Sequence, residues 1–187
     1  MNKWTVAIVV AGSLVWGQAA LAAPIQTHCA NDEVTLFACP IKKKVVSYCA
    51  GPQRPPYTYI EYRYGVPGKV EKTYRADGTA NNMFVSSVPL GPKESVHSIW
   101  FQEGAVTTDL LHCGGGNCQL STPGLVVMNG TKLLAKLMCS GDVKGDIWDF
   151  PVKEGDNGGL APDNTTLLKA KENASEPENI LMNAKIK

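Results

Sequence analysis

A short loop bracketed by two cysteines is the part of this 187-residue chain whose residue types are most unusual. Cys113 and Cys118 enclose three glycines and an asparagine, and His112 precedes the first cysteine. Cysteines that face each other across a tight hairpin approach the Cα separation of about 4.4–6.8 Å that a disulfide requires, and glycine accepts the positive φ angles of the turn. We therefore predict a Cys113–Cys118 disulfide at the base of a stiff, narrow loop.

This loop has two interpretations. A rigid loop loses little entropy on binding, which suits it to entering the cleft of a partner protein. The alternative is a stapled hairpin turn that contacts nothing. Under the binding interpretation the expected contact residues are His112, Gly114, Gly115, Gly116 and Asn117.

The cysteine count predicts a disulfide framework, because an even number in an oxidising compartment is typical of one. Besides Cys113 and Cys118 the chain has four others, which allow three pairings: Cys29, Cys39, Cys49 and Cys139. A Cys39–Cys49 link is plausible because these residues lie in adjacent expected strands, although Cys29 and Cys139 are available to either. The histidine and cysteine spacings fit no zinc pattern, so we expect neither a metal site nor a cofactor.

Catalytic motifs do not stand out, and we predict that the protein is not an enzyme. The chain contains neither a G-x-S-x-G elbow nor an H-E-x-x-H pair. His97 alternates with apolar residues of an expected strand, which indicates a sheet-surface residue and not a general base. The carboxylates Asp142, Asp146 and Asp149 lie near Trp148, where a polar loop is a better explanation than a calcium site without EF-hand spacing.

The first 22 residues read as a secretory signal peptide, with a basic start, an apolar run and an Ala-Leu-Ala cleavage site. Loss of Lys3 with this leader would reduce the formal charge from +1 to zero. A chain without a basic excess is not expected to bind nucleic acid or an anionic membrane. No later apolar run approaches the roughly 18 residues of a membrane-spanning helix. We expect a periplasmic protein, or a secreted one.

The remaining chain reads as a succession of short strands separated by turns. Residues 57–64 alternate, so that Ile60, Tyr62 and Tyr64 would face a core while Tyr59, Glu61 and Arg63 would face water. Residues 40–44 form an expected basic turn, and Asn129-Gly130 is the strongest hairpin signal. Helical spacing is not sustained, so the fold class is all-β: an antiparallel sandwich or small barrel, stapled by disulfides.

Domain boundaries follow from the change in composition after Phe150. We expect a β domain over residues 23–152. Residues 153–187 are rich in Asn, Asp, Glu, Gly and Lys, and such a segment buries too little surface to offset its ordering entropy. We therefore expect a polar, flexible C-terminal tail.

Several segments together resemble a family of small exported β proteins of Gram-negative bacteria, most of which have no assigned activity. The segments are Leu36-Phe37-Ala38-Cys39, residues 43–49, residues 60–65, Lys69-Val70-Glu71 and residues 134–139. The resemblance implies a β fold and export. A fainter likeness is to periplasmic lysozyme inhibitors, which block a muramidase cleft with a disulfide-bounded loop.

The resulting hypothesis is a non-enzymatic periplasmic protein that occludes a cell-wall hydrolase, or that neutralises a secreted toxin as an immunity protein does. Its partner would be a protein. A second hypothesis is a barrel that holds a small apolar ligand or envelope component. A third is an enzyme whose site is assembled from dispersed residues, which would require a cleft of convergent titratable groups.

Overall fold

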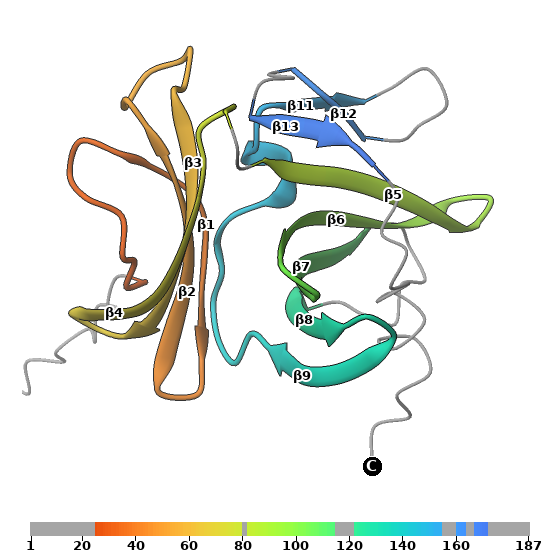
Figure 1. Ribbon diagram of the computed structural model, residues 1–187, viewed down its shortest axis with the longest axis horizontal. Coiled ribbons are helices and arrows are strands. Elements are labelled where there is room, and N and C mark those ends of the chain that lie inside the picture. The colour runs from red at the N-terminus through yellow and green to blue at the C-terminus, as the bar shows by residue number, and fades with distance from the viewer. Residues whose placement is uncertain (1–24, 80–81, 115–121, 155–159, 164–166, 172–187) are drawn as a thin grey trace, which may run out of the picture.

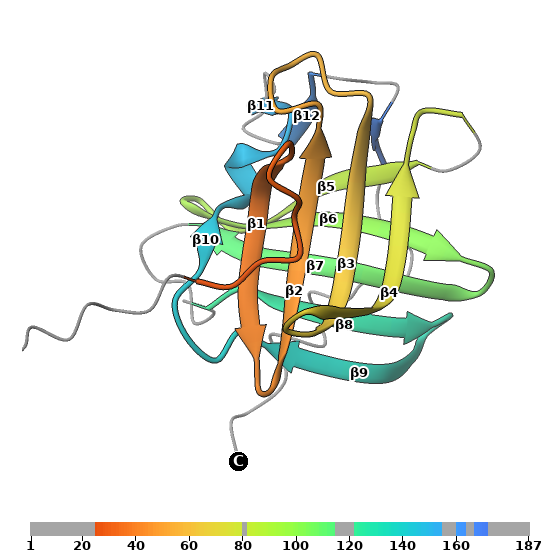
Figure 2. The same cartoon turned by 90° about the vertical axis from the view of Figure 1, so that its left-hand side faces the viewer.

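The computed structural model describes residues 25–79, 82–114, 122–154, 160–163 and 167–171. Most of these residues form two large β-sheets that lie face to face, as Figure 1 shows edge-on, and a third sheet has only two strands. Figure 2 shows the strands of the front sheet running across those of the rear sheet. The all-β prediction is confirmed, and of the two architectures left open the structure has the sandwich. The expected leader, residues 1–22, lies outside the described residues.

The first sheet is antiparallel and has the strand order β10-β1-β2-β3-β4. Its strands are β1 (Val34–Ile41), β2 (Lys44–Gly51), β3 (Tyr59–Val66), β4 (Lys69–Ala76) and β10 (Lys144–Gly145). The turn between β1 and β2 is shorter than the expected residues 40–44, because pairing continues through Pro40 and Val45 to Ile41 and Lys44. Lys42 completes that turn with a φ of 57°.

The second sheet has the strand order β13-β5-β6-β7-β8-β9. Its strands are β5 (Met83–Gly91), β6 (Glu94–Glu103), β7 (Val106–Gly114), β8 (Gly124–Asn129), β9 (Lys132–Met138) and β13 (Leu168–Ala170). The predicted Asn129-Gly130 hairpin is confirmed, since it joins β8 to β9. Gly130 has a φ of 55°, a left-handed conformation that glycine adopts without steric cost.

Aromatic rings fill the space between the sheets. Tyr48 of β2 meets Tyr62 of β3 and Phe150 edge-on, with ring centroids 5.4 and 5.3 Å apart. Phe101 of β6 reaches across the layers to Tyr62 at 5.1 Å and stacks on Tyr74 of β4 at 4.1 Å. Aromatic pairs at these separations add to the hydrophobic stabilisation of a core. A sandwich interior filled by side chains gives no support to a barrel that encloses an apolar ligand.

Two disulfides fix the first sheet to the rest of the chain. Cys39 of β1 is bonded to Cys139, which follows β9, and Cys49 of β2 is bonded to Cys29. The Cys39–Cys49 link considered from the sequence is therefore wrong. In the β1–β2 register Cys39 lies opposite Val46, three residues along β2 from Cys49, and adjacent strands allow a disulfide only between residues that lie close together.

The region expected to be a tail contributes strands, so the β structure extends beyond residue 152. β11 (Val152–Glu154) pairs with β12 (Leu160–Pro162), and β13 joins the second sheet parallel to β5. Leu167 and Leu168 are buried in the core, 1% and 0% exposed. These two leucines and the hydrogen-bond ladder to β5 hold the segment in place. The composition of the segment does not reveal that β5 is available as a partner. Residues 172–187 lie outside the described residues.

Among the residues that the structure describes, no helix is long and apolar enough to span a membrane.

Candidate functional site

The predicted contact residue His112 lies near the end of β7, on the strand face that points toward the first sheet. It pairs across the ladder with His97 of β6, and Gly114 pairs with Ser95. Strand partners on one face have Cβ atoms about 4.5–5.5 Å apart, so the two histidines are direct neighbours. The β6–β7 ladder therefore positions both imidazoles at one end of the sandwich.

A separate segment brings a carboxylate to His112. The single-turn helix η1 (Ile147–Asp149) follows β10, and Asp146 caps its N-terminus by accepting from the Ile147 N–H at 2.5 Å. The Asp149 carboxylate accepts from the Asp146 N–H at 2.7 Å and completes a capping box. Asp146 Oδ1 also lies 2.8 Å from His112 Nδ1. A carboxylate only accepts, so Nδ1 donates this hydrogen bond.

Gly145 allows Asp146 to approach His112. It has a φ of 74° and pairs with Phe37 of β1 just before Asp146. A Cβ at this position would lie 2.1 Å from the Leu36 carbonyl oxygen, which no side chain tolerates. Glycine is therefore required where the chain crosses β1 and turns Asp146 toward β7.

Two further aromatic groups complete the site. The Trp148 ring lies 4.8 Å from the His97 ring and is 47% exposed, which is unusual for so large an apolar side chain. His97 is only 4% exposed, and its Nε2 shares a hydrogen bond of 2.7 Å with Ser95 Oγ. The prediction of a sheet-surface histidine is therefore wrong, because η1 places Trp148 against the face on which His97 lies. We call the group Ser95, His97, His112, Asp146 and Trp148 the His112 site.

The chemistry open to this site follows from the orientation of His112. Its Nδ1 is engaged by Asp146, and within the described chain no hydrogen bond uses Nε2. The His112 side chain is 25% exposed and that of Asp146 43% exposed, so both are accessible from solvent. An imidazole held by a carboxylate presents its second nitrogen to a partner in a fixed direction. The site suits hydrogen bonding to another molecule.

Some predicted contacts fall outside the described residues. Cys113 takes part in a disulfide, but Cys118 is not described, so the Cys113–Cys118 pairing stays a prediction. Gly115, Gly116 and Asn117 are likewise outside, whereas Gly114 is the last described residue of β7. The sequence did not predict that Trp148 and Ser95 lie near His112. The pattern Asp146-x-x-Asp149 could have indicated η1, since it is a capping-box spacing.

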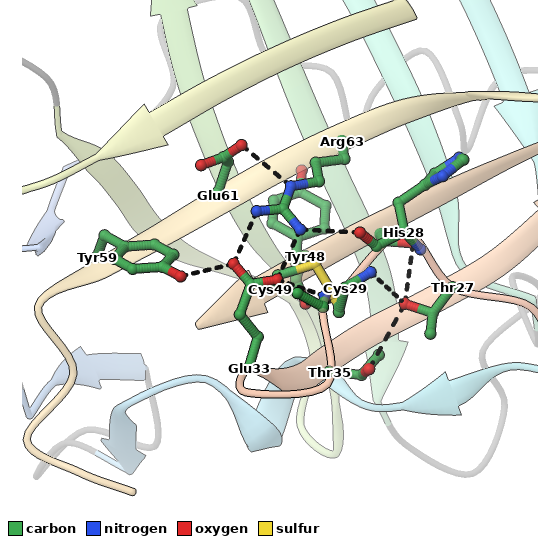
Figure 3. Close-up of a disulfide and its surroundings, with 12 residues drawn as sticks. Thr27, His28, Cys29, Glu33, Thr35, Tyr48, Cys49, Tyr59, Glu61 and Arg63 are labelled. Atoms are coloured by element: carbon green, nitrogen blue, oxygen red, sulfur yellow. Dashed lines mark hydrogen bonds and ion pairs between the residues drawn. A yellow bond between two sulfur atoms is a disulfide. The ribbon is translucent and has the colours of Figure 1, made fainter. Parts of the chain in front are cut away.

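A second polar cluster, on the opposite sheet, was not predicted at all. Residues 27–33 cross the outer face of β2 and β3, and Figure 3 shows the side chains that hold them there. Cys29 is bonded to Cys49, and the His28 N–H donates to Ser47 Oγ at 3.0 Å. We call this segment, with its partners Tyr59, Glu61 and Arg63, the N-terminal clasp. It covers the face of β3 that the alternation pattern assigned to water.

Glu33 is the centre of the clasp, and both of its oxygens are satisfied. Arg63 donates to them in a bidentate pair at 2.6 and 2.7 Å. The Tyr59 hydroxyl donates at 2.6 Å and the Ala30 N–H at 2.7 Å. Arg63 also donates to Glu61, whose other oxygen pairs with Arg75. Charge therefore alternates in sign along four side chains.

Burial and hydrogen bonding act in opposite directions on Glu33. Burial by itself would raise the pKa of this carboxyl, but the hydrogen bonds from Arg63, Tyr59 and Ala30 outweigh it and lower the pKa from 4.5 to about 2. Burial and the bond to Glu33 raise the pKa of Tyr59 to about 12. The carboxylate is thus ionised at any ordinary pH.

The clasp also contains the one metal-like grouping found among the described residues, formed by Cys29, Glu33 and Cys49. The two sulfurs are bonded to each other, and a disulfide sulfur is not the thiolate that zinc requires. The Glu33 oxygens are occupied by donors. This grouping is consequently a structural crosslink.

Comparison of the chain with protein-family models, with curated proteins and with solved structures finds no match. Its fold and site define it as a mostly antiparallel β-sandwich with disulfides, a closed clasp on one sheet and a half-exposed His112 site on the other.

Proposed function

We propose that this chain is an exported protein that acts by binding another protein, and that its partner is a cell-wall hydrolase or a toxin of similar chemistry. The observation that supports this most directly is the pairing of His112 with Asp146 beside the half-exposed Trp148. The His112 site lies immediately before the glycine-rich segment that the sequence marks as a contact loop. The disulfides are consistent with an oxidising compartment.

The contact surface combines two favourable properties. Tryptophan is enriched among the residues that dominate binding energy, because its large side chain excludes water from neighbouring polar contacts. His112 is already oriented by Asp146, so little additional ordering is needed when Nε2 forms a hydrogen bond with a partner. Because Nδ1 carries a proton for Asp146, Nε2 accepts while the imidazole is neutral and donates when it is protonated.

A cell-wall glycosidase suits this surface chemically. Such enzymes carry two carboxyl groups about 5–9.5 Å apart across the scissile bond. Neutral Nε2 of His112 can accept from the protonated acid of such a pair, and the imidazolium can donate to the carboxylate. A hydrogen bond that involves the charged partner would contribute roughly 1.5–3 kcal/mol. Occupation of the carboxylate pair would exclude the substrate.

The experiment measures peptidoglycan hydrolysis by purified muramidases of several classes in the presence of this protein lacking residues 1–22. We expect strong inhibition of at least one class, and weaker inhibition by the His112→Ala and Trp148→Ala variants. His28→Ala is the matched control, since it removes a partly buried histidine from the N-terminal clasp, which lies against the opposite sheet. Unchanged hydrolysis for every class, with no hydrolase bound, would contradict the proposal.

A second candidate function has one specific observation in its favour. Ser95, His97, His112 and Asp146 converge at one end of the sandwich, and an Asp–His pair is a possible general base. The same assays distinguish this candidate, because the purified protein would then hydrolyse a substrate by itself. That activity would disappear in His112→Ala.

A further inference from the structure

β9 forms one edge of the second sheet as far as the structure describes it, and it exposes apolar side chains. Among the described strands it pairs only with β8. Leu133 is 42% exposed and Leu134 49% exposed, and these fractions are large for leucines in a strand. An edge strand with unpaired backbone groups is a template for the addition of another strand.

Charge distinguishes β9 from the other long edge strand, β4. On β4, Glu71 pairs with Lys44 at 2.5 Å and Lys72 pairs with Glu103 at 2.7 Å, while Arg75 pairs with Glu61. On β9, neither Lys132 nor Lys136 has an ion pair with any described residue. Lysine at a sheet edge discourages the addition of a strand that does not neutralise it. On β9, two lysines without a counter-charge among the described residues lie beside two exposed leucines, so a strand that carries both acidic and apolar groups would satisfy both.

The β8–β9 pairing leaves one residue of β9 outside the ladder. Val127 pairs with Ala135 and Met128 with Leu133, so Leu134 between them has no partner in β8. Such a bulge redirects a side chain, and Leu134 is the more exposed of the two leucines.

We propose that β9 is a docking edge for an extended segment of a partner protein that carries both acidic and apolar side chains and adds a strand to the six-stranded sheet. Backbone pairing along residues 132–138 would supply affinity, and the acidic groups would neutralise Lys132 and Lys136. This surface is separate from the His112 site, which lies on β6, β7 and η1, so the proposal goes beyond the function proposed above. In Figure 1, β9 lies at the opposite edge of the sheet from β13.

A second copy of the chain is a poor occupant of this edge. Residues 132–138 contain no acidic side chain, so an antiparallel pair of β9 strands would gather four lysines at one seam. Like charges brought together across a strand pair are destabilising. The uncompensated charge therefore favours an acidic partner over self-association.

The test uses short synthetic peptides and the full protein lacking residues 1–22. The first peptide alternates Glu with Val, the second has Lys in place of Glu, and the third is the Glu peptide with alternate backbone amides N-methylated. We expect only the first to bind and to slow hydrogen exchange of the β9 amides. Lys132→Glu/Lys136→Glu should weaken this binding by about tenfold or more, because two attractions become repulsions.

The control variant reverses charge on the other edge, with Lys69→Glu and Val70→Ser in β4. It should leave binding of the Glu peptide unchanged. Unfolding midpoints of both variants verify that each is folded. The proposal is overturned if the Glu peptide does not bind, if N-methylation or reversal of the β9 charges has no effect, or if the peptide protects β4. It is equally overturned if the wild-type protein dimerises through β9.

Discussion

The N-terminal clasp and the His112 site are built from similar materials and differ in how completely their polar groups are satisfied. Each joins a segment distant in sequence to a sheet through a carboxylate. In the clasp, the Glu33 side chain is 3% exposed and both oxygens accept hydrogen bonds from Arg63 and a second donor. At the His112 site, Asp146 is 43% exposed. Glu33 therefore has no oxygen left for a partner, whereas the His112 and Asp146 side chains are partly exposed.

This contrast assigns different roles to the two regions. A buried and fully hydrogen-bonded ion pair holds one conformation, because separating it would leave a charge without a partner in a region of low dielectric. An exposed pair contributes little to folding and can exchange its interactions with another molecule at small cost. We therefore infer that substitutions in the clasp change stability, while substitutions in the His112 site change binding.

The largest effect on stability is expected from Arg63→Met, which leaves Glu33 buried without its cation. Loss of one partner from a buried ion pair costs about 3–5 kcal/mol, and the Arg63 side chain is only 13% exposed. Urea denaturation measures the loss as a lower unfolding midpoint. The matched control is Lys44→Met, which removes an ion pair whose two side chains are 36% and 35% exposed. A similar midpoint shift in both variants would contradict the idea that the buried ion pair of the clasp stabilises the fold more than an exposed pair does.

Within the clasp, removal of the disulfide is expected to have the next largest effect. Cys29 and Cys49 are separated by 20 residues, and closing a loop of this order stabilises a protein by about 3 kcal/mol in the chain-entropy account. Cys29→Ser/Cys49→Ser should lower the free energy of unfolding by this amount. Cys39→Ser/Cys139→Ser should lower the free energy of unfolding further. The latter bond spans a separation of 100 residues. The reverse order would mean that the clasp is stabilised by more than chain entropy.

Much of the fold could be predicted from the sequence, and the clasp shows why the rest could not. Period-2 alternation correctly placed Ile60 and Tyr62 in the core, and Asn129-Gly130 correctly marked a hairpin. Alternation also assigned Glu61 and Arg63 to water. They are covered because residues 27–33 fold back over β3, and no local pattern indicates where a segment without regular structure will lie.

The same limit applies to the His112 site. His112 was singled out because it adjoins an unusual loop, and Asp146 because it belongs to an acidic cluster, but nothing local relates residues 34 positions apart. Their contact depends on the crossing of β1 at Gly145, which needs the strand order of the sheet to be known. Sequence patterns can select the residue types of a site more readily than they can assemble them.

A smaller and more specific effect is expected in the way the free energy of unfolding changes at acid pH, where Glu33 of the clasp contributes. Because the pKa of Glu33 is lowered to about 2, the unfolded chain binds a proton there before the folded chain does. Its contribution is fully present above pH 4.5 and is lost as the pH falls toward 2. Glu33→Gln should flatten the decline of the free energy of unfolding in this window. An unchanged slope would contradict the assignment of acid sensitivity to the clasp.

The smallest effect on stability, and the largest on binding, is expected at the His112 site. Trp148→Ala and His112→Ala should each change the free energy of unfolding by about 1 kcal/mol or less, since both side chains are partly exposed. Asp146→Asn separates capping from charge, because asparagine also caps a helix but does not carry the negative charge facing His112. We expect Asp146→Asn to retain stability and to weaken hydrolase inhibition. If it unfolds the protein as readily as Arg63→Met does, the two regions have the same structural role, and the distinction between a closed clasp and an available site is lost.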